Sequence, residues 1–249
     1  MIRKALLICS MRGGNYLAGV YSDIRNWSNF LQSNIGGAWE DNEIKEMIDP
    51  TDDEVCNEIL SLNCDYTFIT YSGHGFFSSS EIETKICLRN SNDIDTDVNI
   101  IKLKPLNSRR TTIILDSCRG IEDDLVIESA VPMLEHYAHL KPKRIIYRQL
   151  FDYYIQKSER GINVLYSCSI GESANEKMDG SGGYFTSALI DAALEMDRIY
   201  NTDQVLYINK AFYCASDKMR LLSEPQHPKA SFGRRLHYFP FAVFPKSIL

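Results

Sequence analysis

Short apolar runs recur along the chain, and each has the length of a strand. They are rich in aliphatic and β-branched residues, as expected of strands that are buried on both faces. Such strands form mostly parallel sheets that helices cover from either side, so the pattern predicts an α/β fold. The predicted strands are Lys4–Cys9, Ile44–Ile48, Asp65–Ser72, Thr111–Leu115, Gly161–Cys168 and, as the last strand of the sheet, Tyr238–Phe244.

Amphipathic stretches lie between these runs and predict helices. Their apolar residues recur three or four positions apart, which is the spacing of one helical face. One of them opens with Thr51 and has Glu54 three residues later, the pattern of a capping box. The predicted apolar faces are Val20, Ile24, Trp27 and Leu31; Val55, Ile59 and Leu62; Val131, Leu134 and Tyr137; Phe185, Leu189, Ala192 and Met196; and Val205, Ile208, Phe212, Ala215, Met219 and Leu222.

Two connections lack a strong apolar pattern. Residues 76–109 are polar and irregular, and within them we expect hairpin strands at Lys85–Leu88 and Asn99–Leu103. The second connection, at about residues 141–160, carries a basic cluster that includes Arg144 and Arg148. We interpret that cluster as solvated charge in a linker.

Composition excludes several classes of function. The net charge of −6, from 27 basic and 33 acidic residues, argues against nucleic acid or an anionic membrane as partner. No run approaches the roughly 18 apolar residues of a membrane span, and no signal peptide precedes Lys4. The seven cysteines are scattered without a CxxC pair. These features predict a protein of the reducing cytoplasm and disfavour a zinc site.

Two of the predicted strands end in residues with catalytic potential. Thr111–Leu115 is followed by Asp116, Ser117 and Cys118, and Asp65–Ser72 is followed by Gly73 and His74. If the two strands are parallel neighbours, His74 and Cys118 lie at the same edge of the sheet, where open α/β sheets bind their ligands. Their separation of 44 positions in the sequence leaves room for a crossover connection.

This pair of residue types favours a hydrolase. The pKa of a free cysteine is about 8.5, and a nearby imidazole can deprotonate the thiol and later protonate a leaving amine. The glycines on either side of His74 let the backbone approach a substrate. The alternative is a buried structural cysteine and an unrelated loop histidine, because free cysteine is among the most buried residue types. Residue types alone leave both interpretations open.

The residues around the pair carry a family resemblance. The stretches 71–75 (YSGHG) and 116–120 (DSCRG) resemble the histidine and cysteine boxes of caspase-like cysteine peptidases, and are most similar to those of metacaspases and their bacterial relatives. Residues 164–169, 172–176 and 182–189 resemble the small-subunit segment of the same family. Order and spacing agree over roughly residues 3–245. Arg119 departs from the pattern, since metacaspases usually carry histidine there.

The resemblance implies a fold and a domain organisation. It implies the caspase-hemoglobinase fold, a mostly parallel six-stranded sheet with helices on both faces. It further implies a single domain over residues 1–249, with a large-subunit-like part (1–140), a linker (about 141–160) that is often cut, and a small-subunit-like part (161–249).

The resemblance also implies roles for individual residues. Cys118 would attack the scissile carbonyl, His74 would shuttle the proton, and the backbone N–H groups of Gly75 and Cys118 would hold the oxyanion. Asp23 and Asp116 match the acids of the metacaspase specificity pocket, which implies cleavage after Arg or Lys. Two alternatives remain: Asp23 is a first-turn acid that complements its helix dipole, and Asp116 caps a neighbouring backbone turn.

Cofactors and partners are expected to be few. The expected partner is a protein or peptide substrate, together with an activating or recruiting protein if the chain is a regulated cell-death or defence effector. A catalytically silent homologue that acts as a scaffold or regulator is the alternative. No cofactor is expected. Some metacaspases are activated by calcium, and the corresponding candidates here are Asp93, Asp95, Asp97 and Asp124, for which a solvated acidic turn is the simpler interpretation.

Overall fold

A central sheet of six strands organises the molecule. The structure is a computed structural model, and it describes residues 1–12, 17, 19–121, 144–199, 205–222 and 226–245. The strand order is β10-β8-β7-β3-β1-β2, and all neighbours are parallel except β10 and β8. The predicted α/β fold with a mostly parallel six-stranded sheet is therefore confirmed. The strands are β1 (Arg3–Ser10), β2 (Ile44–Ile48), β3 (Tyr66–Gly73), β7 (Arg110–Asp116), β8 (Gly161–Tyr166) and β10 (Lys229–Phe232).

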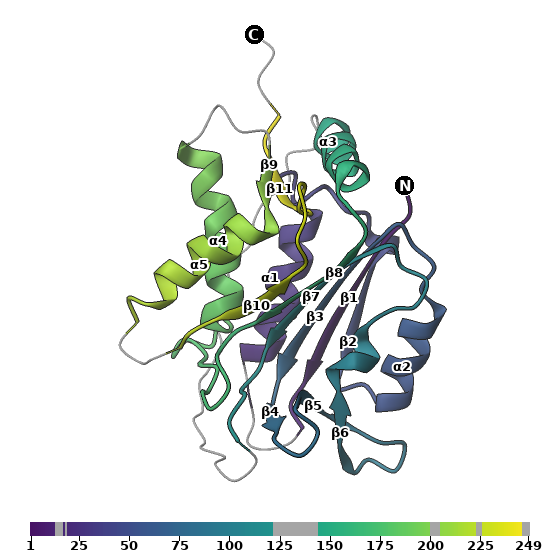
Figure 1. Ribbon diagram of the computed structural model, residues 1–249, viewed down its shortest axis with the longest axis vertical. Coiled ribbons are helices and arrows are strands. Elements are labelled where there is room, and N and C mark those ends of the chain that lie inside the picture. Colours follow the sequence, from purple (N-terminus) through teal and green to yellow (C-terminus); the bar gives the residue numbers. More distant parts are fainter. Residues whose placement is uncertain (13–16, 18, 122–143, 200–204, 223–225, 246–249) are drawn as a thin grey trace.

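Helices cover both faces of this sheet, as Figure 1 shows. The side chains of β1 alternate between the two resulting cores: Leu7 packs with the larger helical layer, whereas Leu6 and Ile8 pack on the side of α2. The larger layer contains α1 (Gly19–Gln32), α3 (Arg144–Lys157), α4 (Tyr184–Ile199) and α5 (Ile208–Met219), and α2 (Asp52–Ser61) covers the opposite face. None of the helices in the described ranges is long and apolar enough to cross a membrane.

A local sequence signal explains where α2 begins. The predicted capping box is present at α2, where Thr51 Oγ1 accepts from the Glu54 amide and the Glu54 carboxylate accepts from the Thr51 amide. Two donors that the first turn of a helix leaves without intrahelical partners are satisfied in this way. The helix then buries Val55 and Ile59 against the sheet. The capping box spans only a few residues, and the start of α2 could therefore be predicted correctly from the sequence.

The polar connection after β3 is more regular than predicted. It forms a three-stranded antiparallel sheet in the order β4-β5-β6, with β4 at Gly75–Ser78, β5 at Glu83–Arg89 and β6 at Asp95–Asn99. The prediction of a strand at Asn99–Leu103 was wrong, because β6 ends at Asn99 and a 3-10 helix follows (Ile100–Leu103). The sequence did not indicate β6 because most of its side chains are polar, and only Val98 of that strand is buried.

Two predictions about the end of the chain were also wrong. The periodic stretch from Val205 begins as a strand, β9 (Val205–Tyr207), and the helix starts only at Ile208. The last strand, β11 (Pro240–Val243), pairs with β9 in a separate two-stranded sheet and does not join the central sheet. The sixth place in the central sheet belongs to β10, whose residues are half exposed and polar enough to read as a loop.

The stretch expected to be a linker contains a helix. Arg144–Lys157 forms α3, which buries Phe151 and Ile155 in the larger core. Arg148, interpreted from sequence as solvated charge, instead donates to the carboxylate of Glu43 and to the carbonyl of Ala38. The helix of residues 131–137 and the acidic stretch from residue 122 lie outside the described residues.

Candidate active site

The ends of β3 and β7 bring the two candidate catalytic residues to one edge of the sheet. These strands are parallel neighbours, and their last paired residues are Ser72 and Asp116. His74 and Cys118 each follow two residues beyond that pair. The geometry that the sequence predicted, with both residues at the carboxyl ends of adjacent strands, is therefore present in the fold.

The segment that carries His74 is held firmly against the cysteine loop. The His74 carbonyl accepts hydrogen bonds from the Tyr71 hydroxyl (2.7 Å) and from the Cys87 amide (3.0 Å). The next residue, Gly75, packs so closely that a Cβ there would lie 3.0 Å from Ser117 Oγ and 2.8 Å from the Lys85 carbonyl. Glycine is thus required at this position by close approach of the two loops.

The thiol of Cys118 is only partly accessible. Its Sγ lies 3.3 Å from the Ala174 amide nitrogen, which donates to it, and 3.7 Å from the Ala174 carbonyl, which accepts from it. Burial raises the pKa of the Cys118 thiol, and the charge of Asp116 raises it further, whereas the hydrogen bond from Ala174 lowers it. The thiol is neutral in this state, so a nearby base is needed to form the thiolate.

Asp23 occupies a buried position behind this edge. It lies one turn into α1 and is 1% exposed. Its carboxylate accepts from the Ser72 hydroxyl (2.5 Å) and from the Gly183 amide (2.9 Å). The interpretation of Asp23 as an acid that merely complements its own helix dipole is therefore wrong, because its partners are on other elements. Burial and then the charge of Asp116 hold the pKa of Asp23 well above its usual range.

Asp116 faces the same region from the end of β7. One carboxylate oxygen accepts from the amide (3.0 Å) and the hydroxyl (2.8 Å) of Thr186 in the first turn of α4. The alternative that Asp116 caps a neighbouring turn is confirmed by these bonds, and they leave its second oxygen without a role in that cap. Burial raises the pKa of Asp116, while the Thr186 bonds lower it.

A third carboxylate, which the sequence pattern did not indicate, joins the two acids. Glu176 accepts from the Gly19 amide at the start of α1 (3.2 Å) and bridges to Gly183. Burial raises its pKa, and so does the charge of Asp116. Glu176 lies inside the segment whose resemblance was noted, but its spacing gave no sign that it would meet acids from α1 and β7.

Together these three side chains form an acidic cluster, which we define as Asp23, Asp116 and Glu176. The charge of Asp116 raises the pKa of Asp23 and of Glu176, and the charge of Glu176 also raises the pKa of Asp23, so the free cluster favours partly protonated carboxyls. A bound cation would reverse this effect by stabilising the carboxylates. The arrangement can therefore recognise a positively charged group beside the thiol of Cys118.

The other sequence candidates lie elsewhere or have structural roles. Asp93 pairs with Arg12 (2.5 Å), and Asp95 and Asp97 lie on β6. The described part of the chain contains no group of three or more acidic, cysteine or histidine side chains placed to hold a metal ion, and Asp124 lies outside it. Cys168 is fully buried and its pKa is raised to about 12, which fits the packing role predicted for it.

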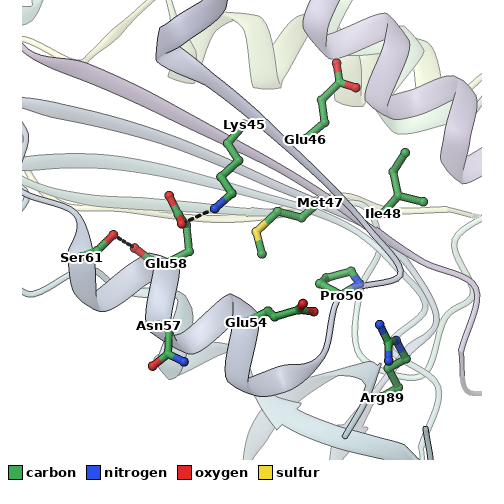
Figure 2. A pocket seen from close by; sticks show the side chains of 10 residues that line it. All are labelled: Lys45, Glu46, Met47, Ile48, Pro50, Glu54, Asn57, Glu58, Ser61 and Arg89. Carbon is green, nitrogen blue, oxygen red and sulfur yellow. Dashed lines mark hydrogen bonds and ion pairs between the residues drawn. The ribbon is translucent and has the colours of Figure 1, made fainter. Parts of the chain in front are cut away.

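A shallow groove between β2 and α2 is separate from this site. Its volume is about 510 Å³, and Figure 2 shows Lys45 of β2 reaching Glu58 of α2 across it. Its lining includes none of the predicted catalytic or substrate-binding residues. The hollow therefore adds nothing to the chemistry at the carboxyl ends of β3 and β7.

The fold and the site together define the class of protein: an α/β protein with a mostly parallel sheet, in which a cysteine and a histidine follow the ends of adjacent parallel strands. The family model for the caspase domain matches residues 2–233, so the chain belongs to the caspase-domain family of cysteine peptidases. A caspase-1 from Spodoptera frugiperda is similar in structure, with a TM-score of 0.57 and 13% identity over 92% of this chain and 86% of that one. That likeness shows the fold. No curated protein matches the sequence.

Proposed function

We propose that the protein is a cysteine endopeptidase of metacaspase type that cleaves after Arg, and more slowly after Lys. His74 takes the proton of the Cys118 thiol, and the thiolate forms a bond to the scissile carbonyl carbon. The backbone N–H groups of Gly75 and Cys118 hold the oxyanion, and His74 then protonates the leaving amine. Water hydrolyses the thioester and restores the thiol.

The acidic cluster is the single observation that carries the specificity. Its three carboxyls converge from α1, β7 and the segment before α4, and two of them, Asp23 and Asp116, are almost completely buried. Burying carboxylates together costs free energy unless a cation compensates them. The fork of an arginine can donate several charge-assisted hydrogen bonds to such a cluster, which the point charge of lysine does less well.

A panel of matched peptides tests this function. The substrates differ only in the residue before the scissile bond, which is Arg, Lys, Leu or Asp, and the measured quantity is kcat/KM. We expect the order Arg, then Lys, with Leu and Asp far below, because like charges repel Asp from the cluster. Faster cleavage of the Leu or Asp peptide would show that the three acids have another role.

The covered thiol supports a second element of the proposal, which is regulation. Cys118 is partly buried and its pKa is raised, so the state described here is poorly reactive. We propose a cytoplasmic cell-death or defence effector that an activating or recruiting partner switches on. All seven cysteines are free, which supports a reducing compartment. The alternative, a silent scaffold, predicts that an electrophilic Arg peptide leaves Cys118 unmodified under every condition.

A further inference from the structure

Arg119, the residue directly after Cys118, is a buried cation. It is 7% exposed, and burial lowers its pKa. Its main chain is fixed on both sides: the Arg119 amide donates to the Glu172 carbonyl (2.9 Å), and the Gly171 amide donates to the Arg119 carbonyl (2.8 Å). The direction of the side chain is therefore set by the loop that also carries the thiol.

The guanidinium of Arg119 joins two parts of the site. Its Nε donates to Thr84 Oγ1 (3.0 Å) on β5, within the β4–β5 hairpin that directly follows His74. Its terminal nitrogen donates to the Cys168 carbonyl (3.2 Å), just beyond the end of β8. The cysteine loop is thus tied to the histidine hairpin on one side and to the neighbouring strand on the other.

Two aromatic rings also lie close to the guanidinium of Arg119. Its central carbon lies 4.1 Å from the ring centroid of Tyr166 and 5.9 Å from that of Phe77. Both hydrogen-bond acceptors are neutral, so the buried charge is compensated by dipoles, by ring faces and by the nearby charge of Glu83, with which it forms no direct ion pair. An apolar side chain of similar volume would fill this space at a lower cost in desolvation. Packing alone does not account for an arginine here.

We propose that Arg119 is a positioning residue that sets the Cys118 thiol against His74. The planar fork reaches two acceptors in different directions, which lysine cannot do. Proton transfer within a dyad depends steeply on geometry, and a displacement of about 1 Å can cost about 100-fold in rate. The inference rests on the proposed function in one respect, namely that Cys118 and His74 form the reacting pair.

The test uses substitutions that remove one contact at a time. Thr84→Val removes the hydroxyl that accepts from Arg119, and Thr84→Ser keeps it. Thr111→Val is the matched control, because Thr111 is equally buried and its hydroxyl has no hydrogen-bond partner among the described residues. Arg119→Lys and Arg119→Gln remove the fork itself. Unfolding curves and circular dichroism establish which variants fold.

Two rates are measured, the kcat of Arg-peptide cleavage and the alkylation of Cys118 by iodoacetamide as a function of pH. For Thr84→Val and the two Arg119 variants we expect kcat to fall about 10- to 100-fold, while KM changes less than about threefold because the acidic cluster is untouched. Their alkylation profiles move toward higher pH, as for a thiol without its base. Thr84→Ser and Thr111→Val behave as the wild type.

A folded Thr84→Val variant with the wild-type kcat and alkylation profile would overturn the proposal, whether or not the Arg119 variants fold. The alkylation profile also separates the two hypotheses. Suppose that the wild-type protein cleaves no peptide, but that His74→Ala shifts the alkylation profile of Cys118 toward higher pH. This result contradicts the proposed peptidase function only, because it shows that His74 still acts as the base for the thiol. In that case a shifted profile in Thr84→Val still supports the positioning role of Arg119.

Discussion

Arg148 and Glu43 form a two-pronged ion pair between segments that lie 105 residues apart. The two guanidinium nitrogens of Arg148 lie 2.8 Å and 2.7 Å from the two carboxylate oxygens of Glu43. Arg3 donates to the same carboxylate and stacks on Trp39, 4.5 Å from its ring centroid. This network fastens α3 to the first third of the chain.

Replacing Glu43 should therefore destabilise the protein strongly. Glu43→Gln leaves the Arg3 and Arg148 guanidinium groups without their shared carboxylate, and breaking a buried pair in this way costs about 3–5 kcal/mol. Urea unfolding measures the change. Glu58→Gln is the control, since Glu58 pairs with the half-exposed Lys45 and its loss should cost less than about 1 kcal/mol. Equal losses in the two variants would contradict the assignment.

The same carboxylate predicts an acid-dependent stability. Arg148 and Arg3 lower the pKa of Glu43 from 4.5 to about 2, against the opposing effect of burial. A lowered carboxyl pKa stabilises the folded state above the unfolded value, so the stabilisation is complete above about pH 4.5 and is lost as the pH falls toward 2. It amounts to about 3 kcal/mol. Burial raises the pKa of Asp152, so this group has the opposite effect on the pH dependence of stability. It does so in the wild type and in Glu43→Gln alike. The difference between wild type and Glu43→Gln should therefore shrink over this pH window.

The acidic cluster predicts that cation binding releases protons. Its free carboxyls have raised pKa values, and a bound guanidinium lowers them, so affinity should increase as the pH rises through the pKa of the free cluster. Calorimetric titration of Cys118→Ala with agmatine, in buffers of different ionisation enthalpy, measures both affinity and protons released. Affinity that does not depend on pH would contradict this coupling.

Removing one acid of the cluster should weaken both effects. Glu176→Gln is expected to cost about 2 kcal/mol of agmatine binding, or about 30-fold in affinity, and to reduce the number of protons released. Asp217→Asn is the control, because Asp217 is exposed and pairs with the exposed Arg220. If Glu176→Gln binds agmatine with unchanged affinity, Glu176 does not take part in cation binding.

The catalytic pair should behave as a unit. Cys118→Ala and His74→Ala should each lower kcat about 10³-fold or more without changing the fold, and the double variant should be little worse than either. Peptide cleavage and circular dichroism check both expectations. Cys168→Ala is the control for the nucleophile. If it abolishes cleavage and Cys118→Ala does not, the nucleophile has been assigned to the wrong cysteine.

Self-cleavage, if it accompanies activity, should occur after Lys143 rather than after Arg144 or Arg148. A peptidase site accepts an extended chain, whereas Arg148 lies inside α3 and Arg144 donates from its first turn to the Gln32 carbonyl (2.5 Å). Mass spectrometry should find two fragments that Lys143→Gln removes and Arg148→Gln does not. Lys143 lies outside the described residues. An active enzyme that stays a single chain would contradict the prediction of self-cleavage.

Much of the site could be predicted from local sequence because it lies at strand ends. The buried runs before Gly73 and Asp116 identified β3 and β7, and each run stopped where its chemistry began. Parallel pairing then required His74 and Cys118 to share one edge of the sheet. The capping box at Thr51 and the apolar face of α2 were equally readable, because their signals span only a few residues.

Other features depended on contacts between distant segments. The edge strand β10 and the strand β6 carry too few buried residues to show a periodic pattern, and only hydrogen bonding to β8 and β5 makes them strands. The helix α3 shows few buried positions of its own, and it is fastened by Glu43. The spacing of apolar residues along an element indicates which of its faces is buried, but it does not indicate which other element packs against that face.

The sequence by itself determined the order of elements, the α/β class and the two residues that the fold brings to one edge of the sheet. Only the tertiary structure decided what surrounds them. It placed Glu176 beside Asp23 and Asp116, and it turned Arg119 from a departure in a motif into a tie between two loops. The physical reason is that burial and electrostatic interactions depend on distances in space between groups that are far apart in the sequence. No local sequence pattern encodes those distances.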